Sequence, residues 1–476
     1  MTWTDYLSEA VRTQINCRVF AAFNANVDMV INVRPEDVAA ITAAHPELLG
    51  QKHHRVPGRP VSTPAQFLTL LEECLEAGKS YYDVVQAELG EWFLQYFPEH
   101  TEAMGGQAGI IANQMAALGA QAYVYNPVLS ELQAEMYDPR VRFPVLEQGR
   151  LQWVPIREGV NSTWTKVNYI FEYPKDAVYQ FGDRTVTTVR ANRVILGTRN
   201  PLAAMGFSEE IEPYLPEVGA AVDVGFMAGY HHGRIEGRAD TLEEFLELSL
   251  RQHSALKSQN PELKLHYEYV PMTASVEEEV LLRTLVPRFD SFGINETEII
   301  RVLDALGFEE EAGEIARNER SFSLYQGALA LWRELGVQRM HLHNLGYYII
   351  IIAKPYHVSP EDVRRACLFA SAVNAVKAKQ GGAVPYDAVA QMADIPLSSI
   401  GFTQLECFAE EAGAAGYPVE EDFVRTGIME AEDHIMILVP AHVVPNPVST
   451  VGMGDTVSSS AFAAEVSLGL RTGGPI

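Results

Sequence analysis

Short apolar runs alternate with longer amphipathic segments through most of the chain after residue 200. The segments between the runs, such as residues 242–252, 296–306 and 359–379, have the spacing of helices. Strands that are apolar throughout and separated by helices form a mostly parallel sheet with helices on both faces. The pattern therefore predicts the α/β class, with strands at residues 220–226, 263–269, 291–294, 339–343, 347–352 and 434–439.

The first 200 residues divide between this pattern and a different one. Residues 17–23 predict another buried strand, and residues 104–118 predict a glycine turn followed by a helix. Residues 31–97 are weakly patterned, whereas residues 151–199 alternate as strands with one exposed face do. We therefore expect two domains. The large domain would comprise residues 1–30, 98–150 and 200–476, and a small β-rich domain would comprise residues 31–97 and 151–199.

Composition argues against several classes of protein. A formal net charge of -26 over 476 residues disfavours binding to nucleic acids or anionic membranes, whose phosphates the protein would repel. The chain has no apolar run long enough to span a bilayer and no signal-peptide pattern, so we expect a cytoplasmic protein. The cysteines are widely spaced and predict neither a metal cluster nor disulfides: Cys17, Cys74, Cys367 and Cys407.

A glycine loop near the C-terminal end is the first candidate for a catalytic element. Gly452-Met453-Gly454-Asp455 precedes a small, alanine-rich run that predicts a buried helix. Backbone N–H groups at the start of a helix, together with the helix dipole, favour phosphate oxygens. Asp455 would stay ionised in this positive environment and could take a proton from an attacking hydroxyl. A glycine turn that Asp455 merely caps is the alternative.

Two carboxylates at strand ends suggest a divalent metal site. His266 and Glu268 lie two residues apart and therefore point to the same face of a predicted strand. Asn295 and Glu298 follow the next strand, where they could equally form a capping box. Carboxylates near a phosphate loop suit Mg²⁺, which prefers oxygen ligands, keeps several waters and is usually shared with substrate phosphates.

Polar residues also follow the first buried strand. Asn24, Asn26 and Asp28 come directly after an apolar run, where α/β proteins bind ligands beyond the carboxyl ends of their strands. The small domain concentrates cations in a protein that is poor in them, and guanidinium groups bind phosphate in fixed geometry. A solvated basic face is the alternative for these residues, which are Lys166, Arg184, Arg190, Arg193 and Arg199.

The order of these motifs resembles that of a known family. Asn-x-Asn-x-Asp, Gly-Gly-Gln, Ala-Asn-Arg, His-x-Glu, Asn-x-x-Glu, His-x-His and Gly-x-Gly-Asp occur between residues 20 and 465 as in the archaeal ADP-dependent phosphofructokinases and glucokinases. The chain looks nearest to the methanogen phosphofructokinases. The resemblance implies a ribokinase-like α/β fold, with a three-layer αβα, Rossmann-like large domain and a smaller β-rich lid domain.

The resemblance also implies roles for individual residues. The catalytic loop would comprise Gly452, Met453, Gly454 and, as the base, Asp455. The carboxylates that hold Mg²⁺ or another divalent cation, mostly through water, would be Glu268 and Glu298. The sugar hydroxyls would contact Asn26, Asp28, Gly105, Gly106 and Gln107. The co-substrate ADP would contact Asn295, His343, Tyr348, Val443, Val444 and Asn446.

The small domain bears on the choice of sugar. Glu88 resembles a glutamate with which glucokinases of the family contact glucose, but Asn168 stands where they tend to have a histidine. Lys166, Arg193 and Arg199 fit a 6-phosphate. The resemblance therefore implies fructose 6-phosphate as the acceptor, with fructose 1,6-bisphosphate and AMP as products. Whether glucose is a further substrate stays open.

Three alternatives share parts of this pattern: an ADP-dependent glucokinase, an ATP-dependent ribokinase-type sugar kinase, and a non-catalytic sugar- or nucleotide-binding regulator. The complete glycine loop, with Asp455 and Glu298, argues against the regulator, because a binding protein needs no base. The expected partners are small molecules, with no nucleic acid and no membrane. The sequence leaves open whether the protein is a monomer or a dimer.

Overall fold

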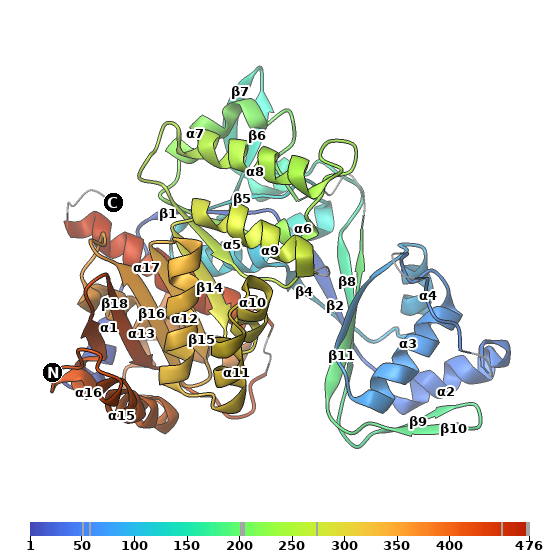
Figure 1. Ribbon diagram of the computed structural model, residues 1–476. Helices are drawn as coiled ribbons and strands as arrows, with labels where there is room; N and C mark the ends of the chain where they lie inside the picture. Colours follow the sequence, from blue (N-terminus) through green and yellow to red (C-terminus); the bar gives the residue numbers. More distant parts are fainter. Residues whose placement is uncertain (50–51, 57–58, 200–204, 273–274, 449–450, 473–476) are drawn as a thin grey trace.

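The computed structural model describes residues 1–49, 52–56, 59–199, 205–272, 275–448 and 451–472 of the chain. The larger body is built around an eleven-stranded sheet with the strand order β17-β18-β16-β15-β14-β13-β12-β1-β5-β6-β7 (Figure 1). In that order the strands span Ile428–Glu430, His434–Pro440, Tyr347–Ala353, Arg339–Asn344, Ser291–Asn295, Lys264–Glu268, Val224–Met227, Arg18–Ala22, Gln121–Tyr125, Arg142–Glu147 and Arg150–Pro155.

The central strands of this sheet are parallel and its two margins are antiparallel. Strands β15, β14, β13, β12, β1, β5 and β6 pair in parallel, each with the next. Strands β16, β18 and β17 on one side, and β7 on the other, pair in antiparallel fashion. The predicted mostly parallel sheet is therefore confirmed, and its parallel part positions several strand ends at a single edge.

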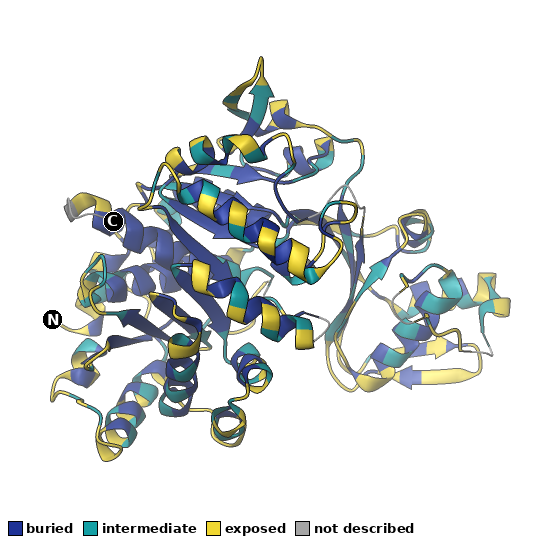
Figure 2. Ribbon diagram, turned by 45° about the horizontal axis from the view of Figure 1, so that its top comes forward, coloured by how far each residue is buried: buried dark blue, intermediate teal, exposed yellow. Residues whose placement is uncertain are grey.

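Helices cover both faces of the sheet, which gives the three layers. On one face, α17 (Met453–Thr472) packs against α13 (Pro360–Gln380) and α5 (Gln107–Ala117). The other face carries α12 (Ser321–Leu335), α10 (Glu298–Leu306), α9 (Ser275–Thr284) and α8 (Leu242–Lys257). The strands between the two layers are almost wholly buried, whereas the outer faces of the helices are exposed (Figure 2). None of the described helices has the length and apolar character needed to cross a membrane.

The remaining helices of the larger body are short or lie at its periphery. Helix α1 packs on α13, and α15 packs on α12 and β18. These helices are α1 (Trp3–Ala10), α6 (Glu131–Glu135), α7 (Leu215–Ala220), α11 (Glu309–Arg317), α14 (Tyr386–Ala390), α15 (Ser399–Ala414) and α16 (Phe423–Thr426).

A second, smaller unit stands apart from this body (Figure 1). Its five-stranded sheet has the order β3 (Tyr81–Val85), β11 (Asn192–Thr198), β8 (Val167–Tyr173), β2 (Asn26–Asn32) and β4 (Thr101–Gly105). Its own core includes Phe67, Phe93 and Phe171, with ring centroids of Phe67 and Phe171 4.7 Å apart. The unit also contains α2 (Pro35–Ala44), α3 (Pro64–Ala77), α4 (Leu89–Tyr96) and the hairpin of β9 (Val178–Phe181) and β10 (Arg184–Thr187).

The sheets divide the chain differently from the expected boundaries at residues 30, 98 and 151. Strand β7 joins the large sheet, where Trp153 lies 4.6 Å from the ring of Tyr123. Strands β2 and β4 join the small sheet, because the apolar side chains of β2 contribute to the small core. Local alternation identifies strands in these segments but carries no information about their partners.

Candidate active site

The carboxyl ends of three neighbouring parallel strands carry residues expected to bind the metal or the nucleotide. Glu268 ends β13, Asn295 ends β14, and His343 lies one residue before the end of β15. The N-termini of α5 and α17 reach the same edge of the sheet. The Nε2 of Gln107 in α5 is 3.5 Å from the Glu268 carbonyl oxygen, and Gly454 of α17 lies against His343. Five separate elements therefore meet at this edge.

Glu268 is buried and accepts hydrogen bonds from two histidines. Its Oε2 lies 3.0 Å from Nε2 of His266, and its Oε1 lies 2.7 Å from Nε2 of His343. Burial opposes ionisation of this carboxyl, but the charge of His343 and the two hydrogen bonds outweigh burial and lower the pKa of Glu268. Burial would lower the pKa of His343, but Glu268 raises it above its ordinary value. Glu268 and His343 therefore each favour the charged form of the other.

Glu298 belongs to a local turn as well as to the site. Its backbone N–H donates to Oδ1 of Asn295 at 2.8 Å, and its Oε2 accepts from the N–H of Asn295 at 3.2 Å. The capping arrangement considered as the alternative is therefore present, and it uses one oxygen of the carboxylate. Burial, together with the charges of Glu268 and Asp455, raises the pKa of Glu298 to about 7. These mutually repelling carboxylates form a site of high negative potential.

The glycine loop leads into the N-terminus of α17, as its sequence predicts. Gly452 has a φ of +65°, and a Cβ there would lie 2.6 Å from Cδ1 of Ile110 in α5. A Cβ on Gly454 would lie 3.1 Å from Cε1 of His343. Both glycines thus permit close approach of the loop to its neighbours. Helix α17 begins at Met453, and because the first N–H groups of a helix lack intrahelical partners, this end of α17 suits an anion.

Asp455 is half-buried in the first turn of α17. Burial and then the negative charge of Glu268 raise its pKa to about 6, although Gln107, His343 and Lys377 act in the opposite direction. This upward shift of the pKa runs opposite to the one expected from the helix dipole. A pKa near neutrality suits a group that must take up a proton.

The polar residues of β2 form one hydrogen-bonded group with β8. Asn26 donates from Nδ2 to Oδ1 of Asp28 at 2.6 Å, and Asn168 donates to the same oxygen at 3.2 Å. Burial raises the pKa of Asp28 to about 6. A Cβ on Gly105 would collide with Asp28, and Gly106 has a φ of +75°. The two glycines therefore allow β4 and the start of α5 to pass close to this group.

Three of the five cations considered as a phosphate site, Lys166, Arg193 and Arg199, lie around this group. Lys166 is buried, and its Nζ donates to Oδ1 of Asn24 at 2.6 Å. Burial and the charge of Arg199 lower the pKa of Lys166 to about 7. Arg193 is half-buried on β11, and its charge lowers the pKa of Asp28. Arg199 is exposed just beyond the end of β11.

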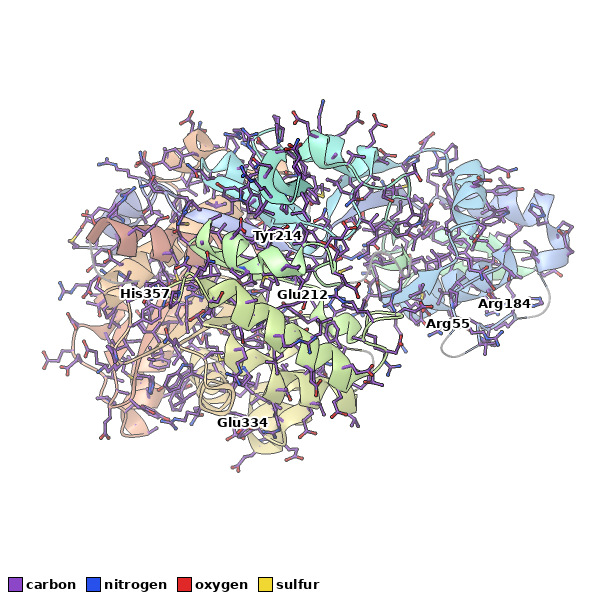
Figure 3. The ribbon with its side chains drawn as sticks, turned by 90° about the horizontal axis from the view of Figure 1, so that it is seen from above. Arg55, Arg184, Glu212, Tyr214, Glu334 and His357 are labelled. Carbon is purple, nitrogen blue, oxygen red and sulfur yellow. The ribbon has the colours of Figure 1, made fainter. Side chains whose placement is uncertain are left out.

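The other two arginines bind to groups of the scaffold, which favours the structural alternative for them. Arg184 pairs with Glu72 of α3 at 2.7 Å, and Arg190 donates from Nε to the carbonyl oxygen of Gly78 at 2.6 Å. Figure 3 shows Arg184 toward the far end of the small unit, near the labelled Arg55. The partners of Arg184 and Arg190 are a carboxylate of α3 and a backbone carbonyl directly after it. Both are far from the arginines in sequence, so a local sequence pattern does not predict them.

Two residues expected to contact ligands, Tyr348 and Glu88, have different surroundings. Tyr348 is only 4% exposed and interacts with Ser371 and Asn374 of α13, so little of its ring remains for a purine. Glu88 is exposed directly before α4 and has no hydrogen bond or ion pair to the other candidate residues in the described part of the chain.

The expected adenine wall follows β18 on the way to the glycine loop. Val443 and Val444 are half-buried, and Val444 packs against the main core. Asn446 is exposed, with a φ of +53°. His343, expected among the nucleotide contacts, is held against Glu268.

Comparisons with known proteins agree with this geometry. The family model described as "ADP-specific Phosphofructokinase/Glucokinase conserved region" matches residues 17–464. The chain belongs to this family. An ADP-specific phosphofructokinase of Methanosarcina acetivorans is 31% identical over 458 residues, covering 94% of this chain and 92% of the relative.

Solved structures of ADP-dependent kinases have the same fold. The last common ancestor of ADP-dependent phosphofructokinases from Methanosarcinales superposes with a TM-score of 0.84 at 31% identity, covering 98% of this chain and 96% of that one. An ADP-dependent kinase in complex with fructose 6-phosphate and ADPβS superposes with a TM-score of 0.81 at 30% identity, with the same coverage. The predicted family and the predicted α/β fold, including the smaller β-rich unit, are therefore confirmed.

The carboxylate group at the sheet edge fits the divalent cation that ADP-dependent kinases imply. Glu268, Glu298 and Asp455 offer oxygen donors, and their charges act on one another. Within the described residues, no three Asp, Glu, His or Cys side chains are close enough to hold a metal directly. The donor set therefore suits Mg²⁺ that keeps most of its water and binds mainly to phosphate oxygens.

The structure adds one residue that the sequence does not predict, Lys377, and a partner for another, Asn24. Lys377 of α13 is buried, donates to the Gly382 carbonyl oxygen at 3.1 Å, and interacts electrostatically with Asp455. Asn24 was noted among the polar residues after the first strand, but its partner Lys166 comes from a distant segment. A buried lysine in a helix has no distinctive local pattern, so Lys377 could be found only through α13 packing against α17.

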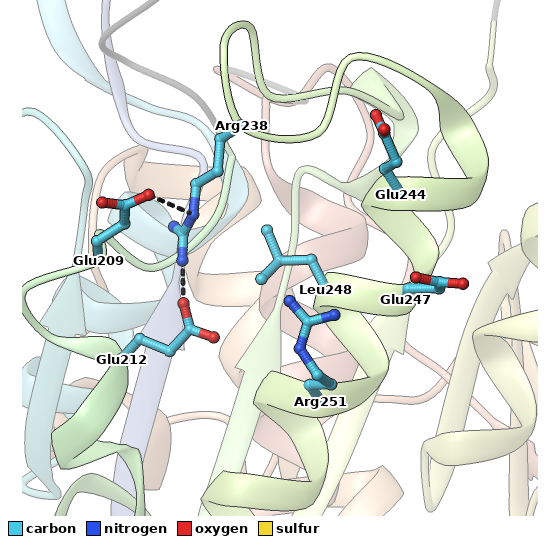
Figure 4. A pocket seen from close by; sticks show the side chains of 7 residues that line it. All are labelled: Glu209, Glu212, Arg238, Glu244, Glu247, Leu248 and Arg251. Atoms are coloured by element: carbon cyan, nitrogen blue, oxygen red, sulfur yellow. Dashed lines mark hydrogen bonds and ion pairs between the residues drawn. The ribbon is translucent and has the colours of Figure 1, made fainter.

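A surface pocket of about 430 Å³ lies elsewhere, beside α8 (Figure 4). Arg238 pairs there with Glu209 and Glu212. The excess of carboxylates over guanidinium groups disfavours phosphates, and we assign this pocket no part in the reaction. Its lining residues are Glu209, Glu212, Arg238, Glu244, Glu247, Leu248 and Arg251.

Proposed function

We propose that the protein transfers the β-phosphoryl group of ADP to the 1-hydroxyl of fructose 6-phosphate, with fructose 1,6-bisphosphate and AMP as products. The observation that carries the proposal is Asp455 in the first turn of α17, directly after the glycine loop and beside Glu268. This arrangement combines a base, free backbone donors and metal-binding carboxylates at one edge. Family membership supports ADP as the donor.

The residues at the edge have distinct tasks in the proposed reaction. Asp455 accepts the proton of the sugar hydroxyl, and the freed oxygen forms a bond to the β-phosphorus. The bond between that phosphorus and the bridging oxygen breaks, and AMP leaves with the electron pair. The N–H groups at the start of α17 stabilise the oxygens of the moving group. A bound divalent cation would neutralise charge on the nucleotide phosphates.

The small unit would supply the acceptor site. Asn26, Asp28 and Asn168 offer a buried polar group to sugar hydroxyls. Lys166 has an amide oxygen rather than a carboxylate as its hydrogen-bond partner, so its charge is available to a phosphate. Arg193 and Arg199 would add guanidinium donors to the same 6-phosphate. As a lid, the unit would close over the sugar and exclude water from the phosphoryl group.

The choice of sugar can be tested by comparing kcat/KM for fructose 6-phosphate and glucose. The wild-type protein should prefer fructose 6-phosphate. Arg193→Gln and Arg199→Gln should each lower kcat/KM for fructose 6-phosphate by about 10–100-fold, because a charged hydrogen bond to phosphate is lost. Activity with glucose should change by less than about 2-fold, since glucose has no phosphate to lose.

Arg184→Gln is the matched control, because Arg184 lies on the same unit but pairs with Glu72 of α3. This variant should leave both sugars unaffected. Equal losses for the two sugars in the Arg193 and Arg199 variants, or a wild-type preference for glucose, would refute the placement of the 6-phosphate.

A further inference from the structure

A completely buried ion pair joins α17 to β15 behind the candidate active site. Arg339 and Glu465 both have 0% exposed side chains, and Nη2 of Arg339 lies 2.6 Å from Oε1 of Glu465. The Nε of Arg339 contributes a further bond of 2.9 Å, and Tyr356 donates to Oε2 of Glu465 at 3.0 Å. The guanidinium also stacks over Phe462 of α17, with Cζ 5.1 Å from the ring centroid.

The third nitrogen of this guanidinium, Nη1, begins a chain of contacts that ends at Glu268. Nη1 of Arg339 donates to Oγ of Ser291 at 3.2 Å, and Oγ of Ser291 lies 2.9 Å from Nδ1 of His266. The other ring nitrogen of His266 lies 3.0 Å from Oε2 of Glu268. All of these residues lie on the adjacent strands β13, β14 and β15. A continuous buried path therefore runs from Arg339 to Glu268.

The donor and the acceptor of each hydrogen bond along this path can be assigned. An ionised carboxylate can only accept, so the Nε2 of His266 must carry the proton that faces Glu268. Arg339 can only donate, so Ser291 accepts from it and has one hydroxyl proton left to give. That proton fits Nδ1 of His266, which accepts in this tautomer. Each donor thus fixes the next, and the orientation of Glu268 depends on Arg339.

The same ion pair also positions the helix that carries the base. Glu465 lies roughly three turns beyond Asp455 on α17, and Gly454 at the other end of this span approaches His343 on β15. Buried ion pairs contribute little net stability compared with well-packed apolar residues, because desolvation of both charges is costly. Anchorage of α17 therefore does not by itself explain why charged groups occupy this position.

We propose that Arg339 and Ser291 are positioning residues for phosphoryl transfer. They hold His266, and through it Glu268, in the orientation that suits the metal-bound nucleotide, while Glu465 fixes the helix of Asp455 to the same network. This inference rests on the proposed function, since it concerns the same carboxylates. It goes beyond that function in assigning a role to a buried path, which sets the position of Glu268 relative to Asp455.

The test is the Ser291→Ala variant, which breaks the path and leaves the Arg339–Glu465 pair intact. The Mg²⁺ concentration for half-maximal activity should rise by about 10–100-fold, as is typical when support of a metal-binding residue is lost. The KM for fructose 6-phosphate should change by less than about 2-fold. Ser249→Ala is the matched control, because Ser249 is also buried and, among the described residues, its hydroxyl bonds only to the Phe245 carbonyl oxygen within α8.

An unchanged Mg²⁺ response in Ser291→Ala, or an equal change in Ser249→Ala, would overturn the proposal. Wild-type protein without ADP-dependent activity would instead overturn the proposed function, so the two failures can be told apart. A second readout needs no activity and no variant of Ser291. Nitrogen-15 NMR of the wild-type protein, with His266 assigned from His266→Asn, should find Nε2 protonated and Nδ1 unprotonated; a protonated Nδ1 would contradict the path.

Discussion

Replacement of Asp455 by asparagine should lower kcat by about 10²–10⁴-fold, the usual contribution of a general base. The KM values for ADP and fructose 6-phosphate should change little, because asparagine keeps the size of the side chain and the helix N-terminus. Initial rates at saturating substrates measure this effect. Asp422→Asn, the same change at an exposed aspartate paired with Arg425, should retain wild-type rates.

The pH profile gives the Asp455 prediction a second readout. Burial and the charge of Glu268 raise the pKa of this carboxyl to about 6 in the free protein. The base works when deprotonated, so kcat/KM should be half-maximal near pH 6, approach its plateau above about pH 7, and fall about tenfold per pH unit well below pH 6. The residual activity of Asp455→Asn should lack this transition. Activity of the variant within a few-fold of wild type would rule out Asp455 as the base.

Replacement of Glu268 by glutamine should produce the second large effect. Both oxygens of Glu268 accept hydrogen bonds from histidines, and a glutamine amide would present N–H donors to one of them. The change also removes the carboxylate that favours the protonated form of His343, and loss of one partner of a buried ion pair commonly costs about 3–5 kcal/mol. We expect kcat to fall by about 100-fold or more and the Mg²⁺ requirement to rise.

Magnesium titration and thermal unfolding together measure the Glu268 effect. The midpoint of unfolding should fall in Glu268→Gln, and the pKa of His343 should fall because the carboxylate that raises it is gone. Glu430→Gln is the matched control, since Glu430 is exposed and pairs with Lys354. A Glu268→Gln variant with the wild-type Mg²⁺ response would remove Glu268 from the metal site.

The sequence predicts the elements of this fold better than their neighbours. Apolar alternation identifies β14 and β15, and the glycine loop correctly predicts the start of α17. The same patterns do not reveal that β2 and β4 pair in the small sheet, or that β7 pairs in the large one. Alternation reports which face of a strand is buried, and partner choice depends on contacts between distant segments.

In the candidate site, too, local patterns predict some residues, whereas others depend on contacts between distant segments. The sequence predicts several candidate residues because polar groups next to apolar runs are easily recognised. These are Glu268, Glu298, Asp455 and the polar residues of β2. The low exposure of Tyr348 is not predicted by the sequence, since it depends on packing. The sequence does not predict the buried path through Ser291, because a single serine in a strand has no distinctive local pattern.

The donor nucleotide is the most direct test of the proposed function. Initial rates with fructose 6-phosphate should be measured with ADP and with ATP at equal free Mg²⁺, together with the nucleotide product. ADP should support turnover, with one AMP and one fructose 1,6-bisphosphate formed per cycle, and ATP should be a poor donor. A clear preference for ATP, or consumption of ADP without sugar phosphorylation, would contradict the proposal.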